Sequence, residues 1–304
     1  MKLINADSSV ALQDIPENSI DAVITDPPYN LIKHIKWDLL PSTEVFKRIY
    51  KVMKPGAPAL IMTSSRQDLY TEAILRIRDA GFNISYSSMF WIYNTTPIKG
   101  RINWEKGYIE GFNPRNAVEI IITALKPLEG TVRENIGKYK LPVINFAEAS
   151  IKAGTGSNLP SNLLLDSTMA VEQVQPPITQ TTYNLHAIEN WVFDIPKPSR
   201  SELFFIDRKP HDRYSGMFYG SRKDLDSKEN HMTVKPIKLF AYLISMVTQK
   251  GMTVLDPFAG TGTAMIASYL TGRDCIAIEF NPNYITLALK RLEAYGITHD
   301  LIIY

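Results

Sequence analysis

The chain has 304 residues, of which 45% are hydrophobic and 21% charged, enough to bury a core in one large domain or in one domain with an insert. Lysine and arginine number 33 against 31 acidic residues, a net charge of +2, so bulk charge does not indicate a nucleic-acid partner. No window holds the roughly 20 apolar residues of a transmembrane helix, and the first residues lack a basic leader or an apolar signal core. We therefore expect a cytoplasmic protein with no membrane partner.

The only cysteine, Cys275, lies in the apolar run CIAIEF. One cysteine excludes a disulfide within the chain and a metal site built from several cysteines, and we predict no metal site. Because a free thiol in an apolar run is usually buried, we interpret Cys275 as a buried residue of a strand.

The N-terminal part alternates apolar runs with helical patterns. The apolar runs at 21–25 (DAVIT) and 57–63 (APALIMT) predict buried strands. Apolar residues recur at helical spacing in 42–53 (STEVFKRIYKVM) and in 67–81 (QDLYTEAILRIRDAG), which predicts two helices. Strands that alternate with helices are typical of parallel β-α units and therefore of an open α/β sheet.

The C-terminal part repeats the alternation. Helical patterns occupy 235–249 and begin again at Thr263 and Pro282, and the apolar runs at 252–256 and 274–280 predict strands. Both ends of the chain are therefore α/β, and the fold class that we predict is α/β, with an open, mostly parallel sheet and helices on both faces.

The middle of the chain has a different composition. Residues 130–230 hold clusters of Gly, Pro, Ser, Thr and Asn with little periodicity, which indicates an insert or a loop-rich subdomain. Aromatic residues are interleaved with basic ones near its end, and linkers rarely carry so many aromatics. We interpret this stretch as a surface for nucleic-acid phosphates, with a solvated loop as the alternative. Its basic residues are Lys197, Arg200, Arg208, Lys209, Arg213, Arg222 and Lys223.

The sharpest motif is Asp26-Pro27-Pro28-Tyr29, which directly follows the predicted strand 21–25. Two prolines stiffen a turn and lack N–H donors, so Asp26 and the Pro27 carbonyl form a pocket of hydrogen-bond acceptors. An exocyclic amine of a nucleobase is a poor nucleophile because its lone pair is delocalised, and such acceptors favour a more tetrahedral nitrogen. Tyr29 offers a face to an unstacked base. An ordinary turn at a strand end has a similar composition and stays an alternative.

A second motif is the Gly-rich stretch 255–263 (LDPFAGTGT), a strand end that opens a helix. Glycines at such a junction let the backbone approach a ligand closely, and the helix N-terminus favours an electron-rich group. The spacing is not GxGxxG and the stretch lacks a phosphate-loop Lys, which disfavours a dinucleotide or a nucleoside triphosphate. Glu279 ends the next predicted strand, where a carboxylate can accept hydrogen bonds from ribose hydroxyls. A purely structural turn is the alternative.

Together the motifs resemble amino-group DNA methyltransferases of the β arrangement, in which the catalytic motif precedes the cofactor motif. The resemblance is carried by 231–292, by 5–30, and by 191–202, which looks like the approach to the cofactor-binding helix of these enzymes. It covers about half of the chain. It implies a Rossmann-like fold, S-adenosyl-L-methionine as the cofactor and methylation of DNA.

The resemblance also implies roles for single residues. Asp26, Pro27, Pro28 and Tyr29 match the catalytic motif, whose Asp form usually accompanies methylation of adenine and whose Ser form accompanies that of cytosine N4. The cofactor residues that it implies are Asp7, Thr233, Lys235, Pro236, Asp256, Phe258, Gly260, Gly262 and Glu279. Trp91 falls where the family often has an aromatic that holds the flipped base, and a core Trp is the alternative. Met232 and Val234 depart from the usual Pro and Gln, and we expect little effect.

We therefore predict a site-specific DNA methyltransferase that flips adenine out of the duplex and methylates its N6 amine by direct in-line transfer. Cytosine N4 methylation is the main alternative, followed by RNA or protein methylation and by a non-catalytic DNA-binding subunit. Carbon-5 cytosine chemistry is disfavoured because it needs an activated thiolate and Cys275 lies in a strand. Whether Asp26 takes the proton stays open.

The predicted organisation has three parts: a catalytic half at 1–99, an inserted target-recognition region at about 100–230, and a cofactor-binding half at 231–304. The expected partner is double-stranded DNA. A homodimer, a companion restriction endonuclease and membership of a restriction-modification system stay open, and the recognition sequence has no readable code.

Overall fold

The main structural element is a ten-stranded sheet with the order β11-β10-β4-β7-β3-β2-β12-β13-β1-β14. The computed structural model describes residues 1–31, 38–93, 116–153, 156–158, 161–165 and 234–304, with three short strands outside these ranges. The sheet strands are β1 (Lys2–Asn5), β2 (Ala22–Thr25), β3 (Pro58–Thr63), β4 (Met89–Ile92), β7 (Val118–Leu125), β10 (Leu163–Leu165), β11 (Phe193–Asp194), β12 (Thr253–Asp256), β13 (Asp274–Glu279) and β14 (Asp300–Ile303). Two small hairpins pair β5 (Ile102–Asn103) with β6 (Tyr108–Ile109) and β8 (Ile151–Ala153) with β9 (Gly156–Asn158).

The sheet is parallel apart from β7. This strand is antiparallel to both of its neighbours, β3 and β4, whereas the other neighbouring pairs are parallel. Because β7 runs the other way, its first residues lie at the edge of the sheet where the parallel strands end.

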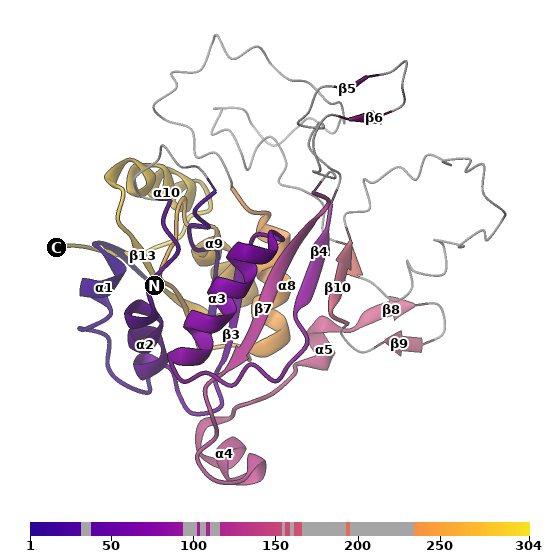
Figure 1. Cartoon of the computed structure of the whole chain (residues 1–304). Helices are drawn as coiled ribbons and strands as arrows, with labels where there is room; N and C mark the ends of the chain where they lie inside the picture. The colour runs from indigo at the N-terminus through magenta and orange to yellow at the C-terminus, as the bar shows by residue number, and fades with distance from the viewer. Residues whose placement is uncertain are drawn as a thin grey trace.

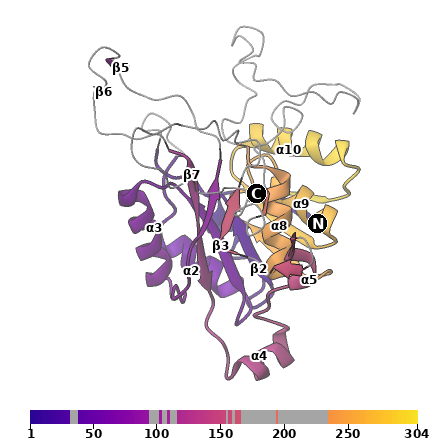
Figure 2. The same ribbon diagram turned by 90° about the vertical axis from the view of Figure 1, so that its right-hand side faces the viewer.

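Helices cover both faces of the sheet, so the architecture has three layers (Figures 1 and 2). Helices α2 and α3 lie on one face, and α8, α9 and α10 lie on the other. The helices of the described residues are α1 (Ser8–Ala11), α2 (Thr43–Val52), α3 (Gln67–Asp79), α4 (Val132–Tyr139), α5 (Phe146–Ala149), α8 (Ile237–Val247), α9 (Thr263–Thr271) and α10 (Pro282–Ala294). The predicted fold class is confirmed.

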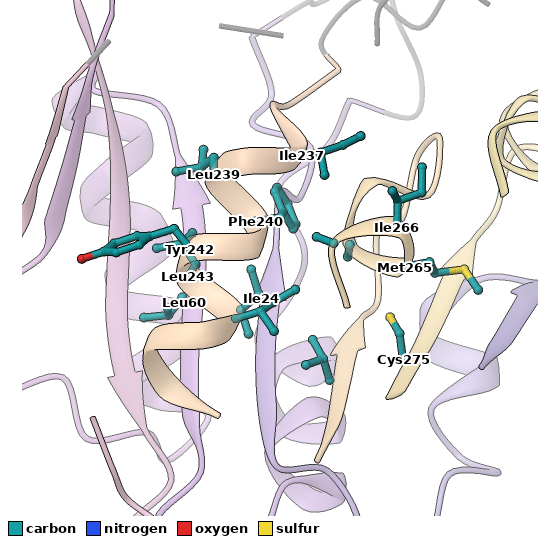
Figure 3. Packing of buried hydrophobic residues seen from close by; sticks show 14 of the residues in the cluster. Ile24, Leu60, Ile237, Leu239, Phe240, Tyr242, Leu243, Met265, Ile266 and Cys275 are labelled. Carbon is teal, nitrogen blue, oxygen red and sulfur yellow. The ribbon is translucent and has the colours of Figure 1, made fainter. Parts of the chain in front are cut away.

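Two hydrophobic clusters form the core, one on each face of the sheet. Successive side chains of a strand point to opposite faces; Val23 belongs to the cluster with Phe46 of α2, and Ile24 belongs to the cluster with Phe240 of α8. Helix α8 is apolar on nearly all sides, and its side chains lie beside the sheet and beside Met265 of α9 (Figure 3). A helix of this composition is buried in the core.

The local elements follow the predicted ones closely. The predicted helix at 42–53 is α2, where the Ser42 side chain accepts a hydrogen bond from the backbone N–H of Val45 and caps the first turn. The predicted strands at 21–25, 57–63, 252–256 and 274–280 are β2, β3, β12 and β13, and the predicted helices at 67–81 and 235–249 and from Thr263 and Pro282 are α3, α8, α9 and α10.

Part of the range 100–230 contributes to the sheet. Strands β7, β10 and β11 come from this range and pair with one another or with strands of the N-terminal part. The extent of a target-recognition region within it stays a prediction. None of the helices in the described ranges has the length and apolar character of a membrane span.

Candidate active site

The candidate site lies where the chain reverses its direction across the sheet. From β2 the chain passes through α2 to β3, and from β12 it passes through α9 to β13 on the opposite side. The connections that leave the neighbouring strands β2 and β12 therefore run to opposite sides of the sheet. In open α/β sheets, ligands bind in the crevice that forms at such a switch point.

A single cavity of about 580 Å³ opens at this edge and is lined by both motifs. This volume is in the range of sites for small molecules and cofactors. The predicted site residues that line it are Asp7, Asp26, Pro27, Pro28, Tyr29, Lys235, Asp256, Phe258, Gly260 and Glu279. Gly262 lies in the same turn, where it precedes α9 with a φ of 77°, and Pro236 precedes the first turn of α8. Thr233 lies outside the described residues.

Asp26 follows β2 directly, and both of its carboxylate oxygens accept hydrogen bonds. Oδ1 accepts from the Tyr29 hydroxyl, and Oδ2 lies 2.6 Å from the Nζ of Lys235. The backbone N–H groups of Tyr29 and Asn30 both donate to Asp38 at 2.9 Å, and they fix the turn after the prolines. The motif is therefore held by hydrogen bonds on both sides of its two prolines.

Tyr29 is buried, with 9% of its surface exposed. Burial and the neighbouring Asp26 and Glu119 carboxylates raise the pKa of its hydroxyl well above 10, so the hydroxyl stays protonated and donates to Asp26. The Nζ of Lys235 lies 5.5 Å from the centre of its ring, a cation–π contact. An ammonium thus lies over the ring that we expected to stack on an unstacked base.

Lys235 stands between two carboxylates from distant parts of the chain. Its Nζ is 2.6 Å from Asp26 and 3.4 Å from Glu119, and 8% of its side chain is exposed. Burial alone lowers the pKa of a lysine, but the two carboxylates raise that of Lys235 above its ordinary value. Lys235 therefore stays charged. The resemblance implied a place for Lys235 beside the cofactor, whereas its Nζ contacts Asp26, Glu119 and the ring of Tyr29.

Glu119 is a site residue that the sequence analysis missed. It lies at the start of β7, within the run VEIIITAL, and 18% of its side chain is exposed. A charged residue inside an otherwise apolar strand is the one sequence signal that pointed to it, because a buried charge needs a partner. Its place beside Lys235 depends on the pairing of β7 with β3 and β4.

Asp256 ends β12 and is almost fully buried. It accepts hydrogen bonds from the Thr25 hydroxyl at 2.6 Å and from the backbone N–H of Phe258 at 3.1 Å. Burial raises the pKa of its carboxyl to about 7, although both hydrogen bonds act against the shift. Asp256 thus ties the Gly-rich turn to the strand that precedes Asp26.

Glu279 ends β13 and holds the Gly-rich turn from the other side. Its carboxylate accepts hydrogen bonds from the backbone N–H groups of Gly260 at 2.8 Å and of Asn281 at 2.7 Å. Burial raises the pKa of the Glu279 carboxyl to about 7. Gly260 has a φ of 52°, a backbone conformation that strongly favours glycine.

Asp7 precedes α1, and its carboxylate accepts a hydrogen bond of 2.7 Å from the backbone N–H of Ser9. Asp7 and Ser8 both line the cavity. The hydroxyl of Ser8 donates to the carbonyl of Pro257. The start of α1 is therefore joined to the Gly-rich turn.

Trp91 lies on β4 and is 3% exposed, as a member of the core cluster on the α8 face. Its ring contacts that of Tyr93 at 4.9 Å between centres. Trp91 is therefore a core residue, which was the alternative interpretation, and its role in holding the flipped base stays a prediction. Cys275 is a buried strand residue, as predicted, and burial raises the pKa of its thiol.

The predicted DNA-facing residues Lys197, Arg200, Arg208, Lys209, Arg213, Arg222 and Lys223 lie outside the described residues. Within the described ranges, no group of three or more His, Cys, Asp and Glu side chains is placed to hold a metal ion.

The three-layer architecture, with a cavity at the switch point of its sheet, places the chain in the Rossmann-like class of α/β proteins. The chain belongs to the DNA methylase family, whose sequence model matches residues 20–290. The resemblance to amino-group DNA methyltransferases is thereby confirmed.

Two curated relatives match nearly the whole chain. The DNA adenine methyltransferase YhdJ of Escherichia coli K12 is 26% identical over 304 residues, which cover 96% of this chain and 82% of the relative. The type II methyltransferase M.HpaI of Haemophilus parainfluenzae is 26% identical over 302 residues, which cover 96% of this chain and 74% of the relative.

Solved structures share the fold. TTHA0409 from Thermus thermophilus, complexed with S-adenosyl-L-methionine, superposes with a TM-score of 0.56 at 21% identity, over 99% of this chain and 98% of that chain. The cytosine-N4-specific PvuII DNA methyltransferase superposes with a TM-score of 0.55 at 17% identity, over 95% of this chain and 85% of that chain.

Proposed function

We propose that this DNA methylase transfers a methyl group from S-adenosyl-L-methionine to the exocyclic N6 amine of adenine in duplex DNA. The observation that carries the proposal is the single cavity that joins Asp26 to the Gly-rich turn and Glu279. A donor bound at the turn and an amine at Asp26 would share one cavity, and such proximity supplies a large part of a rate enhancement.

The cofactor half of the cavity fits S-adenosyl-L-methionine. Glu279 is a half-buried carboxylate at a strand end, where it can accept hydrogen bonds from ribose hydroxyls, and the Gly260 backbone approaches the cavity without a side chain. Asp7, Phe258 and Asp256 complete the group that we assign to the cofactor. When bound, S-adenosyl-L-methionine supplies an electrophilic methyl group on a sulfonium.

The catalytic half of the cavity presents hydrogen-bond acceptors. The Asp26 carboxylate and the Pro27 carbonyl accept the two hydrogens of the amine and favour a more tetrahedral nitrogen. The nitrogen lone pair held at these acceptors would receive the methyl group, the sulfur would keep the electron pair of the broken S–C bond, and the proton that the nitrogen loses would pass to a base, either water or Asp26. Both oxygens of the Asp26 carboxylate already accept hydrogen bonds, from the Tyr29 hydroxyl and from Lys235, and the proposed role is for this carboxylate to accept from the amine as well.

Adenine is the base that we favour. Asp stands at the first position of the Asp26-Pro27-Pro28-Tyr29 motif, and a relative that covers nearly the whole chain is named a DNA adenine methyltransferase. Cytosine N4 is the second candidate, because the PvuII enzyme of that specificity has the same fold.

Duplex DNA is the partner that we propose, with the basic residues from Lys197 to Lys223 as phosphate contacts. Relatives named type II methyltransferases, such as M.HpaI and M.HindIII, support a place in a restriction-modification system. A companion restriction endonuclease and a second copy of this chain, in a homodimer, are the further partners that we propose.

Replacing Asp26 by Ala tests the assigned role. We expect methyl transfer to DNA to fall by at least 10²-fold, since loss of one preorganised polar group typically costs about 10²–10³ in rate, while cofactor affinity stays within about threefold. Asp79→Ala, an exposed carboxylate paired with Arg78, is the matched control and should keep full activity. An Asp26→Ala enzyme with more than a tenth of the wild-type rate would show that Asp26 is not the acceptor.

A further inference from the structure

The ammonium of Lys235 contacts two groups that we expect the target base to contact, the Asp26 carboxylate and the Tyr29 ring. It lies 2.6 Å from Oδ2 of Asp26, where the amine is to donate, and 5.5 Å from the ring centre of Tyr29, on which the base is to stack. The other oxygen of Asp26 already accepts from the Tyr29 hydroxyl. An amine that donates to the Asp26 carboxylate therefore competes with Lys235 for Oδ2.

Withdrawal of Lys235 needs a second anion. A buried ammonium that loses its counter-ion carries a large desolvation cost. Asp26 and Glu119 are the two carboxylates within salt-bridge distance of Lys235 among the described residues. The Nζ lies 3.4 Å from Glu119 Oε2, so a small movement exchanges one carboxylate for the other.

The fold places Glu119 for this exchange. On the antiparallel pair of β7 with β4, Glu119 is opposite Trp91, and residues directly opposite one another point to the same face. Trp91 belongs to the core cluster on the α8 face, and Lys235 lies two residues before α8. The reversed direction of β7 also brings its first residues to the edge that bears Asp26.

We propose that Glu119 is a positioning residue of the active site, which receives the Lys235 ammonium when the target base displaces it from Asp26 and Tyr29. This inference rests on the proposed function. Glu119 acts through Lys235 and makes no contact with the base itself. In its absence, the ammonium stays on Asp26 and competes with the amine for the same oxygen.

Transfer of the Lys235 ammonium from Asp26 to Glu119 predicts a kinetic effect that a purely structural role of Glu119 does not predict. Glu119→Gln removes the second anion with little change in shape, and we expect kcat to fall by about tenfold or more, since misplaced groups in a reacting site cost up to about 10²-fold. The apparent KM for DNA and the Kd for the cofactor should stay within about threefold. Adding Lys235→Met removes the trapped ammonium, so the double variant should be several-fold faster than Glu119→Gln alone.

The assay measures tritium transfer from S-adenosyl-L-[methyl-³H]methionine to unmethylated genomic DNA at saturating cofactor, with Tm and cofactor affinity measured in parallel. The matched control is Glu148→Gln, which removes a carboxylate from its ion pair with buried Arg273 away from the cavity and should leave kcat within about twofold. A Glu119→Gln enzyme within twofold of wild type, or a double variant no faster than Glu119→Gln, overturns the exchange. An inactive wild-type enzyme would instead count against the proposed function.

Discussion

The hydroxyl of Thr25 donates a hydrogen bond of 2.6 Å to the carboxylate of Asp256. Thr25 is the last residue of β2 and precedes Asp26, whereas Asp256 is the last residue of β12 and precedes the Gly-rich turn. This one hydrogen bond therefore joins the Asp26-Pro27-Pro28-Tyr29 motif to the Gly-rich turn across the switch point, between residues 231 positions apart in the sequence.

Thr25→Val should destabilise the protein and should do so more at high pH. The substitution removes a hydrogen bond to a buried carboxylate, and we expect the free energy of unfolding to fall by about 1–3 kcal/mol. Because burial holds the pKa of Asp256 at about 7 and the hydrogen bond favours the ionised form, the loss should be larger at pH 8 than at pH 6. Urea denaturation at both pH values measures it.

Thr63→Val is the matched control for this substitution. Thr63 is a buried strand-end threonine whose hydroxyl has no hydrogen-bond partner in the described part of the chain, so its replacement removes no bond. An equal loss of stability in both variants, or a loss from Thr25→Val that is the same at pH 6 and pH 8, would contradict the assigned hydrogen bond.

Gly260→Val should weaken binding of S-adenosyl-L-methionine by about tenfold or more, which is about 1.4 kcal/mol or more. A β-branched side chain at a φ of 52° is strained and stands where the backbone meets the ligand. Gly251→Val is the matched control, because Gly251 has a φ of 81° and open space around it. Both variants should lose stability. Calorimetry that finds the same cofactor affinity in both would move the cofactor away from the Gly-rich turn.

Glu279 should make the unliganded protein less stable as pH rises towards neutrality. The pKa of its carboxyl is raised from 4.5 to about 7 by burial, so the folded state binds the proton more tightly than the unfolded state does. The stability from this group is present below about pH 4.5 and is lost as pH rises to about 7. Glu279→Gln has no such carboxyl, so this loss is absent from the variant. We therefore expect the decrease in unfolding free energy from pH 5 to pH 7.5 to be about 1–3 kcal/mol smaller in the variant than in wild type. Identical slopes in both proteins would refute the shift.

The basic residues outside the described part of the chain are predicted to contact phosphates. Neutralising Arg208, Lys209 and Arg213 together should weaken binding to all duplexes and reduce the slope of log affinity against log salt by roughly two to three, about one unit for each lost contact. Titrations at several salt concentrations measure the slope. A folded triple variant with the wild-type slope would assign these residues to a solvated loop.

Elements with a strong local pattern could be predicted from the sequence. The apolar run at 21–25 and the helical pattern at 42–53 define β2 and α2 without any knowledge of the remaining chain, and Ser42 supplies the cap that starts the helix. The Gly-rich turn was recognisable because the backbone has a positive φ at Gly260 and at Gly262, and glycine adopts this conformation most readily.

Contacts that depend on pairing between distant strands could not be predicted. Glu119 reaches Lys235 because β7 inserts between β3 and β4 in the reverse direction. The residues near Glu119 in the sequence do not indicate the position or the direction of β7 in the sheet. The contact of Lys235 with Asp26 joins residues 209 positions apart. For Trp91, a position in the core and a position at the base were equally consistent with its neighbours in sequence, and only the packed structure places it in the core.

The central claim is that the cavity between Asp26 and the Gly-rich turn methylates the N6 amine of adenine. The most direct test is mass spectrometry of nucleosides from unmethylated DNA after incubation with the enzyme and S-adenosyl-L-methionine, beside the same reaction with Asp26→Ala. We predict N6-methyldeoxyadenosine with the wild-type enzyme and at least 10²-fold less with the variant. N4-methyldeoxycytidine as the product, or equal amounts of methylated adenine from both enzymes, would contradict the claim.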